Sequence, residues 1–225
     1  RRDVQEEIIA NSKDREVAAK FNDNFGKRPD ILRHPNDILE LAKQGATSFH
    51  ASEELWRNAL QLDTSMRRHE LDNLRIGWDL VLDIDCGFFE YSKIAADLIV
   101  KALKFHDVKS VSCKFSGNKG FHLGVPFEAF PDKIRNEETR KLFPDAPRKI
   151  ALYLREMIKK ELGARIMDFE NNNFNSIIEK TGKKSNEIIY YDNKIRTLNV
   201  EPFLNIDTLL ISSRHLYRMP YSLHE

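Results

Sequence analysis

The stretch DLVLDIDCG, Asp79 to Gly87, constrains the fold of this 225-residue chain more than any other segment. Its run of Leu, Val, Leu and Ile predicts a buried strand, but Asp83 and Asp85 interrupt the end of that run. Side chains alternate along a strand, so residues two apart project from the same face, roughly 7 Å apart. Two carboxylates placed in this way repel each other unless a cation or hydrogen-bond donors neutralise them. Either the acids end a strand in solvent, or they bind a metal ion.

The pattern of apolar residues after this strand indicates an α/β (α+β) fold. It alternates between short β-like runs and helical spacing in the order strand, helix, strand, turn, strand. A long amphipathic helix follows, with Gly163 at its end. The expected strands are 79–85, 108–115, 121–127 and 200–211, and the expected helices are 91–106 and 149–162.

The N-terminal part has a helical and polar pattern. Residues 15–25 carry an apolar stripe at helical spacing, and Pro35 begins a second helix. The sequence shows no internal repeat and no linker between two domains. We therefore expect a single domain over 1–225, in which 1–75 are mainly helical and 76–225 form the core.

Charge and cysteine content exclude several classes of protein. The chain has 36 basic and 35 acidic residues and a net charge of +1, so any contact with nucleic acid has to come from a local basic patch. Cys86 and Cys113 are too few for a disulfide framework or a four-cysteine zinc site, and they are consistent with a reducing, intracellular location. No apolar stretch is long enough to cross a membrane.

The stretch SGNKGFH, Ser116 to His122, lies between two expected strands. Its two glycines allow backbone amides to turn toward an anion, and Ser116, Lys119 and His122 add side-chain donors, a pattern that suits a triphosphate. The spacing of a Walker A loop is missing. Taken alone, the stretch is better explained as a β-hairpin turn with incidental polar residues.

The C-terminal stretch NIDTLLISSRHLYRMPYSLH supplies a third group of polar residues. Asp207 lies in an apolar run, and four basic residues follow it. The simplest explanation is a partnered strand acid and a solvated basic surface. Three carboxylates, a donor-rich turn and a basic tail are nevertheless what two-metal nucleotidyl transfer requires. The basic residues are Arg214, His215, Arg218 and His224.

Other acids lie between the SGNKGFH turn and the C-terminal stretch. Asp168 and Glu170 belong to the polar, Asn-rich segment 167–187, where we expect a short helix, an exposed loop and solvated carboxylates. Asp192 lies in YYDNK, where a turn-like Asp-Asn pair favours local hydrogen bonds. Asp207 alone is embedded in an apolar run, where burial without a partner is costly. It is therefore the acid that we expect to complete the site.

In sequence order, DLVLDID, FSGNKGFH and NIDTLLISSRHLYRMPYSLH resemble the three motifs of the archaeo-eukaryotic primase superfamily. The chain is most similar to the archaeal DNA primase small, catalytic subunit, and the upstream FGKRPDIL and GATSFHASEELWRNALQL extend the resemblance over nearly the whole chain. The resemblance implies a primase catalytic core that contains an RRM-like sheet, with an additional mixed α/β unit. The family usually continues beyond the last motif, so we expect the domain to be truncated at its C-terminus.

The resemblance also implies the residues of the site. Asp83, Asp85 and Asp207 are expected to be catalytic and to hold two ions of Mg²⁺ or Mn²⁺. No zinc is expected, because the Cys and His cluster that many relatives carry is missing. Asn118 occupies a turn position where relatives often carry Arg. The nucleotide-binding residues are expected to be Ser116, Asn118, Lys119, His122, Arg218 and His224.

The activity that the resemblance implies is that of a DNA primase. Such an enzyme is a nucleotidyltransferase that makes short primers on single-stranded DNA in replication and releases pyrophosphate. Its expected partners are the single-stranded DNA template, NTPs or dNTPs, and a primase large subunit or a fused accessory domain. We expect a cytoplasmic location and no membrane partner.

Three other functions compete with this one. A repair or lesion-bypass polymerase of the same superfamily would extend a primer instead of starting one. A non-catalytic RRM-like nucleic-acid-binding module would expose aromatic side chains such as Phe115 and Phe121 for base stacking, but it leaves the acids unexplained. A metal-dependent nuclease is not favoured by the donor-rich turn.

Overall fold

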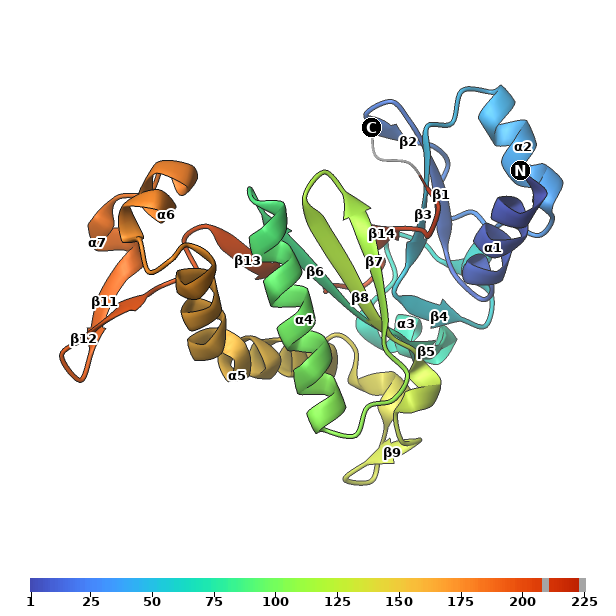
Figure 1. Cartoon of the computed structure of the whole chain (residues 1–225). Coiled ribbons are helices and arrows are strands. Elements are labelled where there is room, and N and C mark those ends of the chain that lie inside the picture. The colour runs from blue at the N-terminus through green and yellow to red at the C-terminus, as the bar shows by residue number, and fades with distance from the viewer. Residues whose placement is uncertain (208–210, 223–225) are drawn as a thin grey trace. The chain divides into compact units, whose positions relative to one another are not determined.

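The computed structural model describes residues 1–207 and 211–222, and for Asp207 it describes the backbone alone (Figure 1). The chain divides into two compact units, each built from separate stretches of sequence. Unit 1 contains 1–81, 125–147 and 211–222, and unit 2 contains 82–124 and 148–207. The boundary expected at residue 75 therefore does not coincide with a boundary between units. Among the described residues, no helix has both the length and the apolar composition needed to span a bilayer.

Unit 1 is built on an antiparallel four-stranded sheet with the strand order β14-β3-β1-β2 and on a separate β4–β5 pair. Its first elements are α1 (Arg2–Ser12), β1 (Val17–Phe21), β2 (Asn24–Phe25), α2 (Pro35–Lys43), β3 (Ser48–Ser52), β4 (Glu54–Trp56), η1 (Ala59–Gln61), α3 (Arg68–Leu74) and β5 (Arg75–Trp78). The later stretches add η2 (Phe127–Ala129), β9 (Lys133–Ile134), β10 (Glu137–Glu138), η3 (Thr139–Leu142) and β14 (Leu216–Arg218).

The prediction of a helix over 15–25 is wrong, because this segment forms the β1–β2 hairpin. Val17 donates its backbone N–H to the carbonyl of Asp30, and β1 pairs with β3 along its length. Asn22 has a φ of 52°, in the left-handed region that Asn tolerates in turns. The description of 1–75 as mainly helical overlooks β1 to β4, which this stretch contains beside α1, α2 and α3. The helix predicted to begin at Pro35 is confirmed as α2.

Unit 1 buries charged side chains that come from distant parts of the sequence. Glu16 is fully buried and accepts hydrogen bonds from Arg28 Nε (3.0 Å) and from two nitrogens of Arg214 (2.9 and 3.1 Å). Glu54 is also buried; it accepts two from Arg75 (2.6 and 2.9 Å) and one from the backbone N–H of Arg214 (2.6 Å). These bonds attach the 211–222 stretch to the first part of the chain.

The 125–147 stretch is attached to unit 1 by two further buried contacts. Asp79 forms an ion pair with Arg15 and accepts the backbone N–H of Phe127 at 3.0 Å. The indole N–H of Trp78, which is fully buried, donates to the carbonyl of Thr139 at 2.8 Å. Both later stretches of unit 1 are therefore hydrogen-bonded to the region of the β4–β5 pair. Residues 125–147 contact Trp78 and Asp79, and residues 211–222 contact Glu54.

Unit 2 has the strand order β13-β6-β8-β7 in one sheet (Figure 1). The sequence of elements, strand–helix–strand–strand–helix–strand, together with this order is the split βαβ arrangement of RRM-like sheets, so the expected fold class is confirmed. The elements are β6 (Leu80–Cys86), α4 (Phe89–Phe105), β7 (Ser112–Gly117), β8 (Gly120–Val125), α5 (Asp145–Phe169), α6 (Phe174–Thr181), α7 (Ser185–Ile188), β11 (Ile189–Asp192), β12 (Ile195–Leu198) and β13 (Leu204–Asp207).

Strand β6 has two different faces. Leu82, Ile84 and Cys86 alternate along it and are buried, whereas Asp83 is half-buried and Asp85 exposed. Helix α4 covers the apolar face of the sheet, because its Phe89 ring packs on Phe121 of β8 with ring centroids 5.5 Å apart. The opposite face, called here the open face, carries the two acids.

Helix α5 is longer than the sequence predicts. It runs through Gly163 and ends at Phe169, so the expectation that Gly163 ends the helix is wrong. A Cβ at position 163 would lie 3.0 Å from the carbonyl oxygen of Leu198 at the end of β12. Glycine is present here because the chain packs closely against the helix, and it does not act as a cap.

Glu170 is buried, which contradicts its expected place on the solvated surface. It accepts hydrogen bonds from the hydroxyls of Tyr91 (2.8 Å) and Ser176 (2.6 Å) and from Lys180 Nζ (2.6 and 2.7 Å). Burial alone would raise the pKa of Glu170, but these hydrogen bonds, led by that of Lys180, outweigh it and lower the pKa. Glu170 thus connects α4, the end of α5 and α6.

The pH dependence of the unfolding free energy should show the effect of burying the carboxyl group of Glu53, a nearly fully buried residue of unit 1. Burial raises the pKa of Glu53 to about 7, and the effect is opposed in part by His215, whose Nδ1 lies 3.6 Å from Glu53 Oε1. The folded state therefore favours the protonated carboxyl. This contribution to stability is complete below about pH 4.5 and is lost as the pH rises to about 7. Because Glu53→Gln stays neutral, the difference in unfolding free energy between variant and wild type should grow by roughly 3 kcal/mol across this range.

Denaturant unfolding at a series of pH values measures this difference. Glu137→Gln, at an exposed position of β10, is the matched control and should follow the wild type. A Glu53→Gln profile parallel to that of the wild type would show that Glu53 is ionised at no cost in the folded protein.

Candidate functional site

Asp83 and Asp85 lie on the open face of β6, as their spacing predicts. The side chain of Asp83 is 30% exposed, and Asp85 is exposed. Between them Ile84 is fully buried on the opposite face. The apolar face therefore holds the strand in place, and the two carboxylates are presented together on the other side.

Strand β13 pairs with β6 in the antiparallel sense and brings Asp207 into register with Asp83. Asn205 stands opposite Asp85 in the same ladder. The side chain of Asp207 lies outside the described part of the structure. Within the described residues, no three His, Cys, Asp or Glu side chains form a group that could hold a metal ion. The role of Asp207 as a metal ligand therefore stays a prediction that is supported by its register.

The turn predicted for SGNKG is the connection between β7 and β8. Gly117 and Asn118 have φ values of 102° and 51°, the left-handed conformations that a tight hairpin needs. In the ladder Lys114 stands opposite His122, and a bulge lies between Phe115 and Gly117. The hairpin therefore places polar residues at the end of the sheet where β6 carries its acids.

Two contacts connect this hairpin to the acids. His122 Nε2 lies 3.4 Å from Asp83 Oδ1. At Gly120, a Cβ would lie 2.7 Å from both the carbonyl oxygen of Ile84 and Ser116 Oγ, and 3.2 Å from Asp85 Oδ1. Only glycine fits this close approach of β8 to β6. Ser116 and His122 are thus held beside Asp83 and Asp85.

Lys119 and Asn118 occupy the tip of the hairpin and are exposed. The Lys119 ammonium lies 5.8 Å from the centroid of the Phe88 ring, just before α4, at a distance that permits a cation–π interaction. Sequence reasoning missed Phe88. Its contact places the Lys119 ammonium near the segment that joins β6 to α4.

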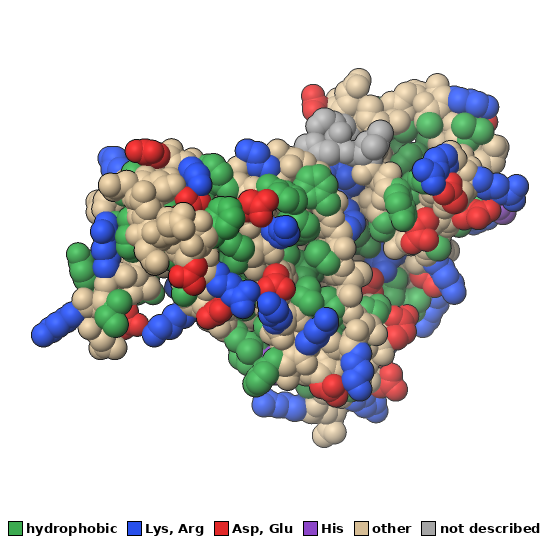
Figure 2. Space-filling view, viewed as in Figure 1, with side chains coloured by type: hydrophobic (Ala, Val, Ile, Leu, Met, Phe, Trp, Pro, Cys, Tyr) green, Lys and Arg blue, Asp and Glu red, His purple; other side chains and the backbone are tan. Residues whose placement is uncertain are grey.

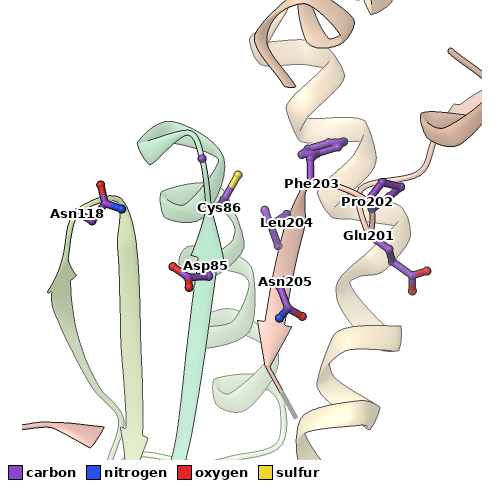
Figure 3. Close-up of a pocket in the computed structure, with 9 residues that line it drawn as sticks. Asp85, Cys86, Asn118, Glu201, Pro202, Phe203, Leu204 and Asn205 are labelled. Atoms are coloured by element: carbon purple, nitrogen blue, oxygen red, sulfur yellow. The ribbon is translucent and has the colours of Figure 1, made fainter. Parts of the chain in front are cut away.

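A pocket of about 410 Å³ opens next to Asp85 (Figure 3). Asp85 and Asn118 lie on one side of it, and the chain that leads into β13 forms the other side. Sequence reasoning missed Asn205 as a member of this site. Asn205 precedes Asp207 by two residues, and this spacing, the same as that between the acids of β6, could have identified it. The further lining residues are Cys86, Gly87, Glu201, Pro202, Phe203 and Leu204.

The other predicted residues belong to unit 1 or lie outside the described residues. Arg218 is on β14 in unit 1, where it stands opposite His50, and His224 lies outside the described residues. Arg214 is engaged by the buried Glu16, and His215 lies beside Glu53. The alternative that Arg214 belongs to a solvated basic surface is therefore wrong, since its guanidinium pairs with the buried Glu16 within unit 1.

Phe115 and Phe121 do not form a base-stacking surface on the open face. Their rings are 5.8 Å apart and both contact Phe89 of α4, at 5.7 and 5.5 Å. They lie on the helix-covered side of the sheet, opposite to the acids. Among the described residues of β6, β7, β8 and β13, none that shares the open face with Asp83 and Asp85 is aromatic. This arrangement removes the main support for a non-catalytic RRM-like module.

Replacement of Gly120 should disturb the site through the backbone. In Gly120→Ala the new methyl group would overlap the Ile84 carbonyl oxygen, so β8 has to move away from β6. We expect a loss of about 1–3 kcal/mol in unfolding free energy, the usual cost of overpacking. Gly87→Ala is the control beside the same pocket, because its Cβ would meet nothing within 4 Å. Equal unfolding free energies for the two variants would contradict the close approach.

Comparisons with known proteins agree with this fold. No protein-family model matches the chain. It is 39% identical over 74 residues to an uncharacterized protein of Methanocaldococcus jannaschii, a match that covers 31% of this chain and 17% of that protein. Its structure is similar to the polymerase domain of Mycobacterium tuberculosis ligase D, solved in complex with DNA, with a TM-score of 0.56 and 14% identity. This similarity covers 99% of this chain and 75% of that domain. The chain therefore has the same fold as that polymerase domain.

Proposed function

We propose that the protein is a DNA primase, which joins nucleotides on a single-stranded DNA template and releases pyrophosphate. The observation that carries this proposal is the placement of Asp83 and Asp85 on the open face, with the donor-rich hairpin packed against the same strand through Gly120. Carboxylates repel phosphates unless a cation lies between them. Acids and phosphate donors at one place therefore indicate a site for a metal-bound nucleotide.

The donor set of this site fits Mg²⁺ or Mn²⁺. Both ions prefer oxygen ligands, and the carboxylates of Asp83 and Asp85 provide them from adjacent positions on one face. The register of β13 supports Asp207 as the third ligand. When bound there, two such ions would lower the pKa of the attacking 3′-hydroxyl and neutralise the triphosphate.

The hairpin residues bind and orient the substrate in this proposal. Ser116, Lys119 and His122 donate to the triphosphate, and Asn118 adds an amide at the tip where relatives often carry Arg. The hairpin is held by backbone pairing and by the contact of Gly120 with β6, so its donors are preorganised relative to the acids. Preorganised charge stabilisation and positioning supply most of the rate enhancement in phosphoryl transfer of this kind.

A second candidate is a polymerase that extends an existing primer. The structural similarity to a ligase D polymerase domain in complex with DNA favours it, since that domain is named as a polymerase. The two candidates share the chemistry and differ in the first substrate. A primase starts from two nucleotides on a bare template, whereas an extending polymerase needs a 3′ end.

Incubation with labelled nucleotides and Mg²⁺ or Mn²⁺ separates the candidates. One reaction contains unprimed single-stranded DNA, and the other contains the same strand annealed to a primer. Products on the unprimed strand support the primase. Products on the primed strand alone identify the extending polymerase, and no incorporation on either strand overturns both. Ribonucleotides and deoxyribonucleotides are compared in each reaction.

Removal of one acid from the open face should abolish synthesis and leave the fold intact. Asp85→Asn keeps the shape of the side chain and removes its charge, so incorporation should fall by at least about 100-fold, the upper range for residues outside the ligand sphere. Melting temperature without metal should hold or rise, because the repulsion between the two acids is relieved.

Asp207→Asn should behave like Asp85→Asn, and Asp192→Asn is the control. Asp192 lies at the β11–β12 turn and pairs with the exposed Lys160 at 3.3 Å, so its replacement should be nearly neutral. Mn²⁺ titration monitored by electron paramagnetic resonance gives a readout independent of synthesis. If Asp192→Asn lost Mn²⁺ affinity and Asp207→Asn did not, the third acid would have been placed wrongly.

Lys119 should act in nucleotide binding and not in proton transfer. Lys119→Ala should raise the KM for nucleotide several-fold with little change in kcat, the mark of an interaction present in both ground and transition states. Lys109→Ala, at an exposed position paired with Asp107, is the control. A large fall in kcat at constant KM would assign Lys119 to the chemical step.

A further inference from the structure

Unit 1 contains a second pocket, of about 310 Å³, which belongs to no part of the acidic site. Three short stretches form it: the end of α1 with the residues that follow, 31–33, and 56–59. Its buried wall contains the fully buried Trp56 and the buried Leu32. Backbone hydrogen bonds from Trp56 to Asp14 (2.6 Å) and from Val17 to Asp30 (2.8 Å) tie the stretches together. The pocket therefore has a fixed frame.

Four basic side chains line this pocket, and one of them is neutralised within the fold. Arg15 is buried, forms an ion pair with Asp79 and donates to the carbonyls of Ser52 (2.8 Å) and Glu53 (3.2 Å). Its charge is therefore matched by an acid of the same unit. It contributes to the frame of the pocket and is not available for a ligand.

The other three basic side chains are exposed at the pocket. Lys13, Arg33 and Arg57 form no side-chain hydrogen bond or ion pair with the rest of the described chain. Asp14 is the acid among the lining residues, so these residues keep an excess of two positive charges once the Arg15–Asp79 pair is set aside. Asp37, which is not a lining residue, offsets part of the charge of Arg33. Like charges gathered on a fixed concave frame repel one another, and a bound anion relieves this repulsion.

We propose that this pocket binds a phosphate group of single-stranded DNA. A phosphate accepts two parallel hydrogen bonds from one guanidinium, so Arg33 and Arg57 are suited to it. The whole chain has a net charge of only +1, and basic and acidic side chains are interspersed on the face seen in Figure 2. A local basic pocket is thus the means by which such a chain can hold a polyanion.

The DNA assignment rests on the proposed function, whereas the binding of an anion does not. Trp56 is fully buried and cannot stack on a base. The contact would therefore be to the backbone alone and would position the strand without reading its sequence. Double-stranded or damaged DNA is not required for this role.

The test compares two charge-matched double variants. Arg33→Gln with Arg57→Gln removes two charges from the pocket, and Lys133→Gln with Arg135→Gln removes two exposed charges from β9 and the turn that follows it. The probe is a fluorescent single-stranded oligonucleotide of about 16 nucleotides without terminal phosphates. Fluorescence anisotropy measures its affinity in EDTA, without nucleotides, between about 50 and about 200 mM salt.

Loss of two phosphate contacts should lower the slope of log affinity against log salt by about 1.4 in the pocket variant. If affinities converge at about 1 M salt, this corresponds to about 25-fold weaker binding at about 0.1 M. The control variant should lose much less affinity. The melting temperature of the pocket variant should hold or rise, because the replaced side chains form no described hydrogen bond or ion pair and their mutual repulsion is removed.

Equal losses in the two variants, or no loss in the pocket variant, would overturn the proposal. Inorganic phosphate is the second probe, followed by thermal shift. If the pocket variant loses stabilisation by phosphate but keeps its DNA affinity, the pocket binds a free anion and the DNA assignment is overturned. A wild type that synthesises nothing, combined with DNA binding that depends on the pocket, would refute the primase proposal and leave the pocket assignment standing.

Discussion

The two faces of strand β6 determine the architecture of unit 2. Ile84 has to be buried against the helices, and the two-residue period of the strand then leaves Asp83 and Asp85 no place except the open face. The neighbouring strands adapt to this arrangement, β8 by means of Gly120 and β13 through its register with the acids. A single packing requirement thus brings the acids, the hairpin and the third motif to the same end of one sheet.

Unit 1 depends instead on buried charge. Removal of one partner from a buried ion pair leaves an uncompensated charge, which typically costs about 3–5 kcal/mol. Glu16 and Glu54 are such carboxylates: Glu16 pairs with the guanidinium of Arg214, from the far end of the sequence, and Glu54 pairs with Arg75 and accepts the backbone N–H of Arg214. The basic tail in the sequence therefore contains residues of two kinds. Arg214 completes a buried network, whereas Arg218 is expected, from the motif resemblance, to contact the nucleotide.

The sequence predicted those features that depend on local periodicity. The β6 strand, α4, the tight hairpin and the shared face of Asp83 and Asp85 all follow from spacings of two or of three to four residues. Features that depend on distant partners were not predictable. The burial of Glu170 requires Tyr91, which lies 79 positions earlier, and the strand at Val17 requires β3 beside it. In such places tertiary contacts override local preference.

The position of β14 at the edge of its sheet has a practical consequence for shortening the protein. This strand covers one side of β3, and the Arg214 that precedes it pairs with Glu16 and donates its backbone N–H to Glu54. A truncated version that ends after β13 would retain the acids of β6 and β13, but it would lose Arg218 and His224 of the third motif. It would also expose the unpaired edge of β3, a site for aggregation, and would remove one of the two arginines of the buried Glu16 and one backbone hydrogen bond of the buried Glu54. The smallest piece that folds is therefore larger than the piece that contains the three acids.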